Sequence, residues 1–184
     1  LHSLDPVQIL KEKNEFIDLV VNLSASPFHL GKDEKRIQRA KQISKYLNAP
    51  FAYINRVGAE DEILFDGQSF LVNGDLLVKK SEAFISAILQ AEIPEYRDVQ
   101  SNIPFAKTSN SWEEIFQHRI DFSSNKLVKL NDEQLHSILS ALQFGIYEYA
   151  RKTGNHQFSI ALSGGIDSSL VLTILKLMKN KYKT

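Results

Sequence analysis

The densest group of chemistry-bearing residues is a short run of serines and glycines near the C-terminal end of the chain. Its members are Ser163, Gly164, Gly165, Ile166, Asp167, Ser168 and Ser169. An apolar segment precedes this run and a helical pattern follows it. A helix N-terminus presents unpaired backbone N–H groups and about half a positive charge. Glycines let a backbone approach an anion closely, and serine hydroxyls add donors. The run therefore predicts a phosphate-binding loop.

The carboxylate of Asp167 within this loop needs its own explanation, because it would repel a polyphosphate. It is consistent with a Mg²⁺ ion between the two anions, or with a role as helix cap. We expect Asp167 to be a metal ligand. No Lys follows Gly165, so the loop differs from a Walker A loop, which needs a Lys directly before its Ser or Thr. The simplest alternative is a serine-capped turn that binds nothing.

The string SGGIDS (163–168) resembles the signature of the N-type ATP pyrophosphatases. Those enzymes adenylylate a carbonyl or carboxylate and release pyrophosphate, which the loop holds. The resemblance implies ATP and Mg²⁺ as cofactors and residues 163–169 as the binding residues for ATP and pyrophosphate. GMP synthetases, asparagine synthetases and tRNA-thiolating enzymes share this loop, so the loop alone leaves the acceptor open.

Other segments narrow the family. YEYARKTG (147–154) followed by the loop looks like the entry to NAD synthetase domains. Upstream, NLSASPFHLGK (22–32), INRVG (54–58) and FDGQSF (65–70) resemble the glutaminase domain of glutamine-dependent NAD(+) synthetases. The order of the two signatures points to this family of ligases. The resemblance implies ATP-dependent amidation of deamido-NAD, with release of AMP and pyrophosphate and with ammonia supplied by glutamine hydrolysis.

The same resemblance implies roles for single residues. Ser26 and Lys32 stand where the family holds its glutamine substrate, and a Lys ammonium suits the α-carboxylate of glutamine. The alternative for Lys32 is a solvated residue on the first turn of a helix. The family's Glu-Lys-Cys triad is expected upstream of Leu1, and the chain has no Cys. We therefore expect no catalytic residue here and an inactive fragment. Two readings stay open: another ATP-pyrophosphatase amidotransferase, or a non-catalytic interaction fragment.

Hydrophobic patterns predict the elements that position these residues. Asp5-Pro6 is typical of a helix start, with a helix through about Lys13. The remaining elements expected in the first half are a strand buried on both faces at 16–23, a loop at 24–28, an amphipathic helix at 32–47, a second buried strand at 51–57, and short strands at 63–65, 69–72 and 76–79. Asn73-Gly74 predicts a hairpin with a type I′ turn. Residues 81–92 could form a helix or a strand.

Three further features of the first half are expected to be structural. Asp66-Gly67 is interpreted as a turn rather than a ligand site, and His29 as an ordinary loop residue. The acidic run 60–62 is interpreted as a solvated loop, because three adjacent acids do not face one point.

The second half contains a polar stretch at 93–130, in which Ser111 and Glu114 predict a short capped helix. Asn131 is expected to cap a helix that Gly154 ends. Its predicted apolar stripe comprises Leu135, Ile138, Leu139, Leu142, Ile146, Tyr149 and Ala150. A strand at 158–162 and a helix from Ser168 to about Lys179 complete the pattern.

An α/β fold is expected, and the resemblance divides it into two incomplete domains. Residues 1–92 correspond to the C-terminal half of a nitrilase-like αββα sandwich, and 93–130 to a linker. Residues 131–184 correspond to the first strand, loop and helix of an ATP pyrophosphatase (Rossmann-like) domain. Both chain ends look cut, since the chain starts at Leu1 and stops within a helical pattern.

Composition excludes several classes of protein. The 184 residues are 43% hydrophobic and 24% charged, with 22 basic and 22 acidic residues. This balance is typical of a folded domain and lacks the basic excess of a nucleic-acid binder. No apolar run reaches the roughly 20 residues that span a bilayer. We expect a soluble, cytoplasmic protein that binds small molecules (deamido-NAD, ATP and glutamine) and no nucleic acid or membrane. The resemblance also implies a homo-oligomer.

Overall fold

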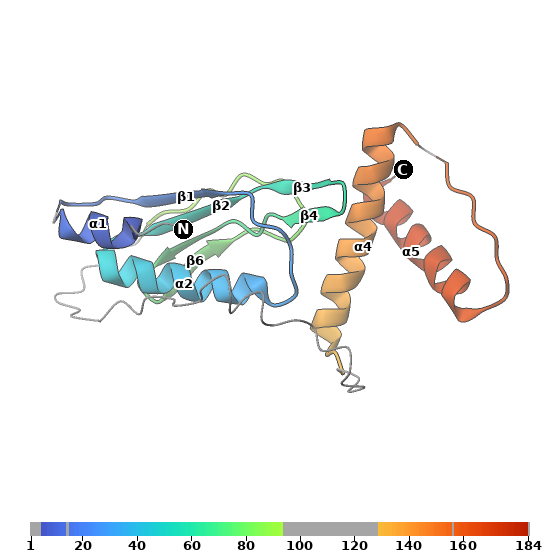
Figure 1. The fold of residues 1–184 in the computed structure, drawn as a ribbon, viewed down its shortest axis with the longest axis horizontal. Coiled ribbons are helices and arrows are strands. Elements are labelled where there is room, and N and C mark those ends of the chain that lie inside the picture. Colours follow the sequence, from blue (N-terminus) through green and yellow to red (C-terminus); the bar gives the residue numbers. More distant parts are fainter. Residues whose placement is uncertain (1–4, 14, 94–128, 156, 184) are drawn as a thin grey trace.

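The structure is a computed structural model that describes residues 5–13, 15–93, 129–155 and 157–183. It has an α/β fold built on a mixed sheet, with two further helices beyond one end of the sheet (Figure 1). None of the described helices is long and apolar enough to cross a membrane.

The main sheet has four strands in the order β1-β2-β5-β6. β1 (Val20–Ser24) runs parallel to β2 (Phe51–Asn55), and β5 (Phe70–Asn73) lies antiparallel on the other side of β2. β6 (Leu76–Lys80) is the far edge strand. Because β1 and β2 are parallel, their C-terminal ends meet at the same edge of the sheet, where Ser24 pairs with Asn55.

The two predicted helices of the first half form and lie on one face of this sheet (Figure 1). α1 (Pro6–Glu12) begins at Asp5, whose Oδ1 accepts a hydrogen bond of 2.9 Å from the Val7 amide. α2 (Lys32–Leu47) has the predicted bounds, and its apolar side faces the strands. The main core lies between them and contains Ala40, Ile43, Leu47, Ala49, Phe51, Tyr53, Phe70 and Val72.

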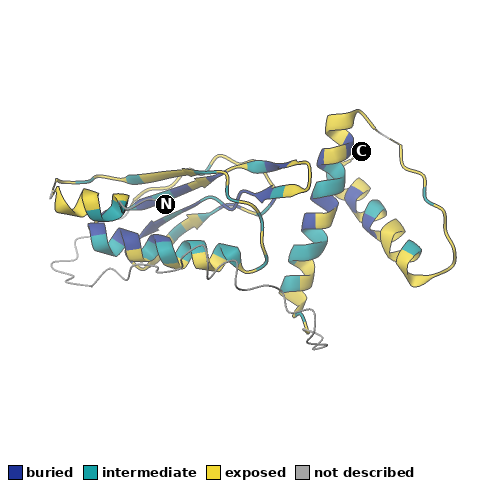
Figure 2. Ribbon diagram, viewed as in Figure 1, coloured by how far each residue is buried: buried dark blue, intermediate teal, exposed yellow. Residues whose placement is uncertain are grey.

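The opposite face of the sheet is apolar and exposed, which contradicts the expectation that 16–23 is a strand buried on both faces. The strand starts only at Val20, and Phe16 and Leu23 are 89% and 77% exposed. β1 is an edge strand, and the two helices lie on the other side of it (Figures 1 and 2). A continuous apolar run can therefore mark a strand whose second face is bare.

The predicted strand at 51–57 is also split. β2 ends at Asn55, and after Arg56 the chain enters a separate two-stranded sheet of β3 (Val57–Glu60) and β4 (Ile63–Asp66). Arg56 keeps the two sheets in contact, because its amide donates to Ser24 O (3.0 Å) and its carbonyl accepts from Gly67 N (2.9 Å).

The Asn73-Gly74 hairpin forms, but its turn differs from the prediction. Asn73 pairs with Leu76, so the two turn residues are Gly74 and Asp75. Of these, only Gly74 has a positive φ, 58°. A type I′ turn needs positive φ at both central residues, whereas positive φ at the first alone is typical of type II′. Residues 81–92, left open by the sequence, form neither a helix nor a strand, although Ala83 forms an isolated bridge with Gly67.

α4 (Asp132–Thr153) begins and ends as predicted. Asn131 and Gln134 form a capping box, and Gly154 ends the helix with φ 71°. The predicted apolar stripe is wrong in part: Leu135, Leu142 and Tyr149 are exposed, whereas Phe144 is buried. The helix contacts α5, β3 and β4, and its buried Ala141 and Phe144 belong to the apolar cluster that contains Phe84.

The predicted strand at 158–162 is absent. Residues 157–163 have no regular secondary structure, and among the described residues none pairs with them. A strand needs such a neighbour for its backbone hydrogen bonds. α5 (Ile166–Tyr182) begins at Ile166 rather than Ser168. The helix predicted from Ser111 and most of the stretch 93–130 lie outside the described residues.

Candidate functional site

The structure keeps the two predicted binding loops apart (Figure 1). The loop with Ser26 and Lys32 joins β1 to α2, whereas the loop at 163–169 leads into α5. Each is therefore a separate candidate site.

The backbone of Ser26 is anchored to the end of β2. Its amide donates to Asn55 Oδ1 (2.8 Å), and Asn55 Nδ2 donates back to Ser26 O (3.2 Å). Because Asn55 is the last residue of its strand and is buried, this pair fixes the start of the loop against the sheet. Asn55 lies within the string INRVG, but the sequence assigned it no role of its own.

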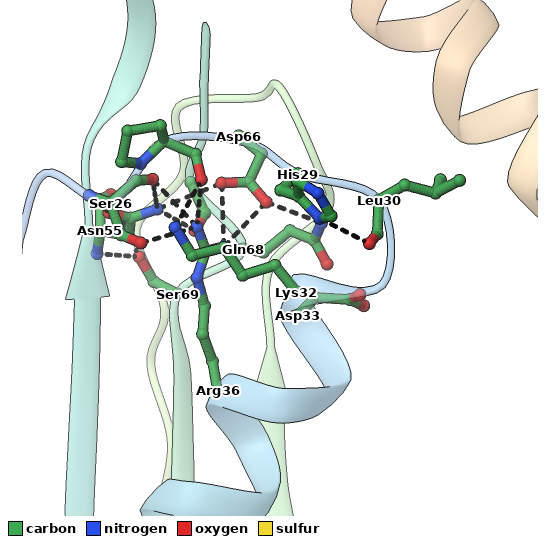
Figure 3. A network of polar contacts seen from close by, with 12 residues as sticks. Ser26, His29, Leu30, Lys32, Asp33, Arg36, Asn55, Asp66, Gln68 and Ser69 are labelled. Atoms are coloured by element: carbon green, nitrogen blue, oxygen red, sulfur yellow. Dashed lines mark hydrogen bonds and ion pairs between the residues drawn. The ribbon is translucent and has the colours of Figure 1, made fainter. Parts of the chain in front are cut away.

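Arg36 connects the loop to a buried carboxylate (Figure 3). Its Nη1 donates to both oxygens of Asp66, at 3.0 and 2.9 Å. Its Nη2 donates to Ser26 O (2.9 Å), Ser26 Oγ (3.0 Å) and Pro27 O (3.0 Å). The two side chains are only 7% and 1% exposed. Such a desolvated, charge-assisted pair has a well-defined geometry.

Asp66 has two further partners, Asn55 Nδ2 (3.2 Å) and Gln68 Nε2 (3.1 Å). The interpretation of Asp66-Gly67 as a turn holds only in part: Gly67 has a positive φ of 67°, but Asp66 is the last residue of β4 and Gly67 forms an isolated bridge with Ala83. The interpretation was also incomplete, because the Asp66 side chain is the buried anchor of the polar network. That role depends on a partner 30 residues away in the sequence, which no local pattern reveals.

Lys32 lies at the first position of α2 and donates from Nζ to Pro27 O (3.2 Å). Arg36 stands one helical turn later, so both cations project over the same loop. Burial lowers the pKa of Lys32, the nearby Arg36 lowers it further, and Asp66 acts in the opposite direction. Lys32 thus contacts the carbonyl of Pro27, the residue that follows Ser26, and Figure 3 shows Ser26 and Lys32 in the same polar network.

Asp33 and His29, which flank this network, interact with residues outside it. Asp33 pairs with Lys80 (2.8 Å). Burial by itself raises the pKa of Asp33, but the hydrogen bond and charge of Lys80, together with hydrogen bonds from the Glu34 and Asp33 amides, outweigh it, so the net shift is downward. His29 Nδ1 contacts Leu30 O (2.9 Å).

The acidic run 60–62 forms the turn of the β3–β4 hairpin. Glu60 pairs with Lys152 of α4 (3.1 Å) and with Arg56. Hydrogen bonds from these two cations lower its pKa. Within the described ranges, no three His, Asp or Glu residues are grouped so that they could hold a metal ion.

The 163–169 loop is closed by its own hydroxyl groups. Ser163 Oγ lies 3.3 Å from Ser168 Oγ and accepts from the Gly165 amide at 3.3 Å. The hydroxyls of Ser168 and Ser169 donate to Gly165 O, at 3.1 and 2.9 Å. Gly164 has φ 82°, a conformation that glycine adopts without strain.

The loop is exposed and meets a helix of 17 residues that has no side-chain cap. Its first-turn amides therefore need other acceptors, which a phosphate supplies. Asp167 stands in this first turn. A Mg²⁺ ion there needs further oxygen ligands, and phosphate oxygens serve that purpose in nucleotide sites. The arrangement fits a phosphate group together with its metal.

Comparison with known proteins gives a consistent family. No protein-family model matches the chain. It is 33% identical over 174 residues to a glutamine-dependent NAD(+) synthetase of Synechocystis and 29% identical over 176 residues to one of Acinetobacter baylyi. Each alignment covers 94% of this chain and 27% of the relative. The chain thus spans about a quarter of the length of the curated relatives it matches.

Comparison with solved structures points to the same family. A glutamine-dependent NAD+ synthetase from Acinetobacter baumannii, in complex with ADP, matches with a TM-score of 0.66 and 26% identity, covering 91% of this chain and 27% of that one. The synthetase from Cytophaga hutchinsonii matches with a TM-score of 0.58 and 22% identity, covering 89% and 23% of the two chains, and supports the fold alone.

Proposed function

Because the chain matches glutamine-dependent NAD(+) synthetases along almost its whole length, we propose that it is part of such a synthetase. The whole enzyme amidates deamido-NAD to NAD at the expense of ATP, releasing AMP and pyrophosphate. Its ammonia comes from the hydrolysis of glutamine. The observation that carries the proposal is the joint position of Ser26 and Lys32 on the Arg36–Asp66 network, within a chain aligned to these enzymes at both ends.

We further propose the division into residues 1–92, from a nitrilase-like glutaminase unit, a linker at 93–130, and residues 131–184, from an ATP pyrophosphatase unit. The bare apolar face of the main sheet supports the first unit, because a sandwich of two sheets needs such a face on each. Strand β1 supplies much of it with Val21 and Leu23. The glycine-rich loop at the start of α5 supports the last unit, whereas the strand expected before it at 158–162 does not form.

In the glutaminase unit, Lys32 supplies the positive charge for the α-carboxylate of glutamine, and Ser26 supplies a hydroxyl hydrogen bond. A carboxylate is bound most strongly where a partly desolvated cation is combined with a hydrogen-bond donor in a fixed position. The loop that holds both is tied to β2 through Asn55, so the substrate would meet a preformed site.

In the synthetase unit, the loop at 163–169 holds the phosphates of ATP and the released pyrophosphate. The backbone amides at the start of α5 would donate to the phosphates, and Asp167 would help to hold a Mg²⁺ ion that neutralises their charge. The hydroxyls of Ser168 and Ser169 donate to Gly165 O in this structure and would turn toward the phosphates to add further donors. The ADP bound to the Acinetobacter baumannii synthetase supports nucleotide binding in this family. Negative charge developing on the leaving pyrophosphate would be stabilised by these donors. We also propose that the enzyme is a homo-oligomer.

The test uses the complete synthetase that carries this chain, with Asp167→Ala. Glutamine hydrolysis should continue, whereas formation of pyrophosphate and NAD should fall at least a hundredfold. Asp132→Ala, at the exposed first turn of α4, is the matched control and should leave both reactions unchanged. Normal NAD formation by Asp167→Ala would overturn the assignment of the loop.

A further inference from the structure

We propose that Arg36 is the positioning residue of the glutamine site and that Asp66 is its buried counter-ion. This inference rests on the proposed function, because it assumes that Ser26 and Lys32 bind glutamine. It adds Arg36 and Asp66 to the proposed pair Ser26 and Lys32, and neither of the two added residues touches the substrate. Arg36 would act by orienting the Ser26 hydroxyl and the Pro27 carbonyl.

Arg36 is unsuited to bind a ligand directly. Its Nη1 is committed to Asp66 and its Nη2 to the oxygens of Ser26 and Pro27. Its Nε is buried and has no hydrogen-bond partner, so the guanidinium makes its hydrogen bonds through its Nη atoms, while its Cζ lies over the Tyr53 ring (5.8 Å to the centroid). The side chain is 7% exposed. All of these contacts point from α2 toward the loop and the sheet (Figure 3).

The contact with Ser26 Oγ sets the polarity of that hydroxyl. A serine hydroxyl carries one donor and two acceptor lone pairs. Because Arg36 donates to the oxygen at 3.0 Å, one lone pair is occupied and the hydroxyl proton turns away from the cation. The proton is then available to an acceptor on the other side. A site with this polarity selects a carboxylate or carbonyl oxygen over an ammonium group.

The charges around the loop add to the same preference. Lys32 and Arg36 carry two positive charges, and Asp66 supplies one negative charge within their network. The next carboxylate along α2, Asp33, is paired with Lys80. One positive charge at Lys32 therefore remains for an anionic ligand. Arg36 and Lys32 share the Pro27 carbonyl as acceptor, which holds the ammonium beside Ser26.

The decisive variant is Arg36→Lys in the complete synthetase, because it keeps the charge beside Asp66 but cannot reach Asp66 and all three loop oxygens together. We expect the KM for glutamine to rise about tenfold, the kcat to stay within about twofold, and the ammonia-dependent reaction to be unchanged. Discrimination between glutamine and glutaminamide, which lacks the α-carboxylate, should collapse. Arg39→Lys, on the same helix, is the matched control and should behave like the wild type.

A double-mutant cycle with Ser26→Ala separates positioning from folding. If Arg36 acts through Ser26, the two increases in KM should not multiply, because removing the hydroxyl removes what Arg36 orients. Independent increases, or a fall in ammonia-dependent activity that parallels the loss of stability, would show a merely structural role and overturn the inference.

Two other outcomes are informative. If Arg36→Lys does not fold, Asp66→Asn replaces it. The amide leaves only one oxygen for Nη1, so the glutamine KM should again rise while ammonia-dependent activity persists, and an unchanged KM would overturn the inference. If the wild-type enzyme uses ammonia but not glutamine, the proposed glutaminase function itself fails. A glutamine-dependent wild type with an unaltered Arg36→Lys variant rejects only the role of Arg36.

Discussion

At the scale of single residues, the loop between β1 and α2 that we propose binds glutamine (the glutamine loop) shows which site residues a sequence can indicate and which it cannot. Ser26 and Lys32 could be selected because they stand in one contiguous string, NLSASPFHLGK. Arg36 and Asp66 could not, because their pairing joins residues 30 positions apart. A buried ion pair of this kind is costly to break from one side, since the remaining charge stays desolvated. The structure was needed to find the residues that hold the motif in place.

The lowered pKa of Lys32 leads to a prediction about pH. Burial and the charge of Arg36 lower this pKa below the ordinary value of 10.5, so the ammonium loses its proton at a lower pH than a free lysine. The KM for glutamine should therefore rise with increasing alkalinity, from below pH 10.5 onward. Arginine stays protonated in this range, so Lys32→Arg should abolish the alkaline rise. The measurement is the pH profile of glutamine KM.

The control for this profile is Lys35→Arg, on the exposed side of the same helix. It should show the same alkaline rise as the wild type. An alkaline rise that persists in Lys32→Arg would mean that another group titrates, and Lys32 would then be solvated helix surface.

The pKa of Lys32 also affects stability, with a definite sign. The folded state holds this proton less tightly than the unfolded state, so the protonated lysine is slightly unfavourable in the fold. Stability should thus increase with pH between the lowered pKa and 10.5. Because Lys32 is partly exposed, solvent screening keeps the effect small.

At the scale of elements, local patterns predicted α1, α2, α4 and the β5–β6 hairpin, because their signals lie within a few residues. Asp5, Asn131 and Gly154 are examples of caps that act locally. The strand expected at 158–162 failed because pairing depends on a neighbour. The stripe of α4 failed because apolar spacing does not tell which part of a wide apolar surface is covered. The sequence predicts where the helices begin and end better than it predicts which residues they contact.

The turn after β4 provides a prediction for an element. Gly67 has φ 67°, and a Cβ there would lie 2.5 Å from Val57 Cγ2. Gly67→Ala thus combines backbone strain with a clash against β3, and overpacking of this kind costs about 1–3 kcal/mol. Gly31→Ala is the matched control, because Gly31 has φ 72° but open space around it.

In Gly31→Ala the free energy of unfolding should fall only by the cost of a side chain in the left-handed region, about 1–2 kcal/mol. Unfolding by urea measures the free energy of unfolding of both variants. Equal losses of stability would show that β3 moves aside without cost and that the turn does not need glycine for space.

At the scale of the whole molecule, aromatic side chains link the glutamine loop to the C-terminal helices. Phe28 packs edge-on against Phe84 (5.3 Å between ring centroids), and Phe84 packs against Phe144 of α4 (5.2 Å). Phe28 is also held by its amide, which donates to Leu64 O (2.7 Å). Tyr182 of α5 continues the cluster at 6.4 Å from Phe144. The parts assigned to the two binding loops therefore share one apolar cluster.

Phe84 is central to this cluster, so its substitution should affect both the stability and the proposed glutamine site. It is buried although its φ is 61°, a strained backbone for a residue with a side chain. That strain is tolerated because the ring fills the space between Phe28 and Phe144. Phe84→Ala keeps the strained backbone and removes the ring, so it should lower the free energy of unfolding by about 3–5 kcal/mol. Phe16→Ala, at a residue that is 89% exposed, should change the free energy of unfolding little.

Because Phe28 lies in the same loop as Ser26, Phe84→Ala should also raise the glutamine KM. A loss of stability without any change in KM would show that α4 docks on the hairpin independently of the glutamine loop.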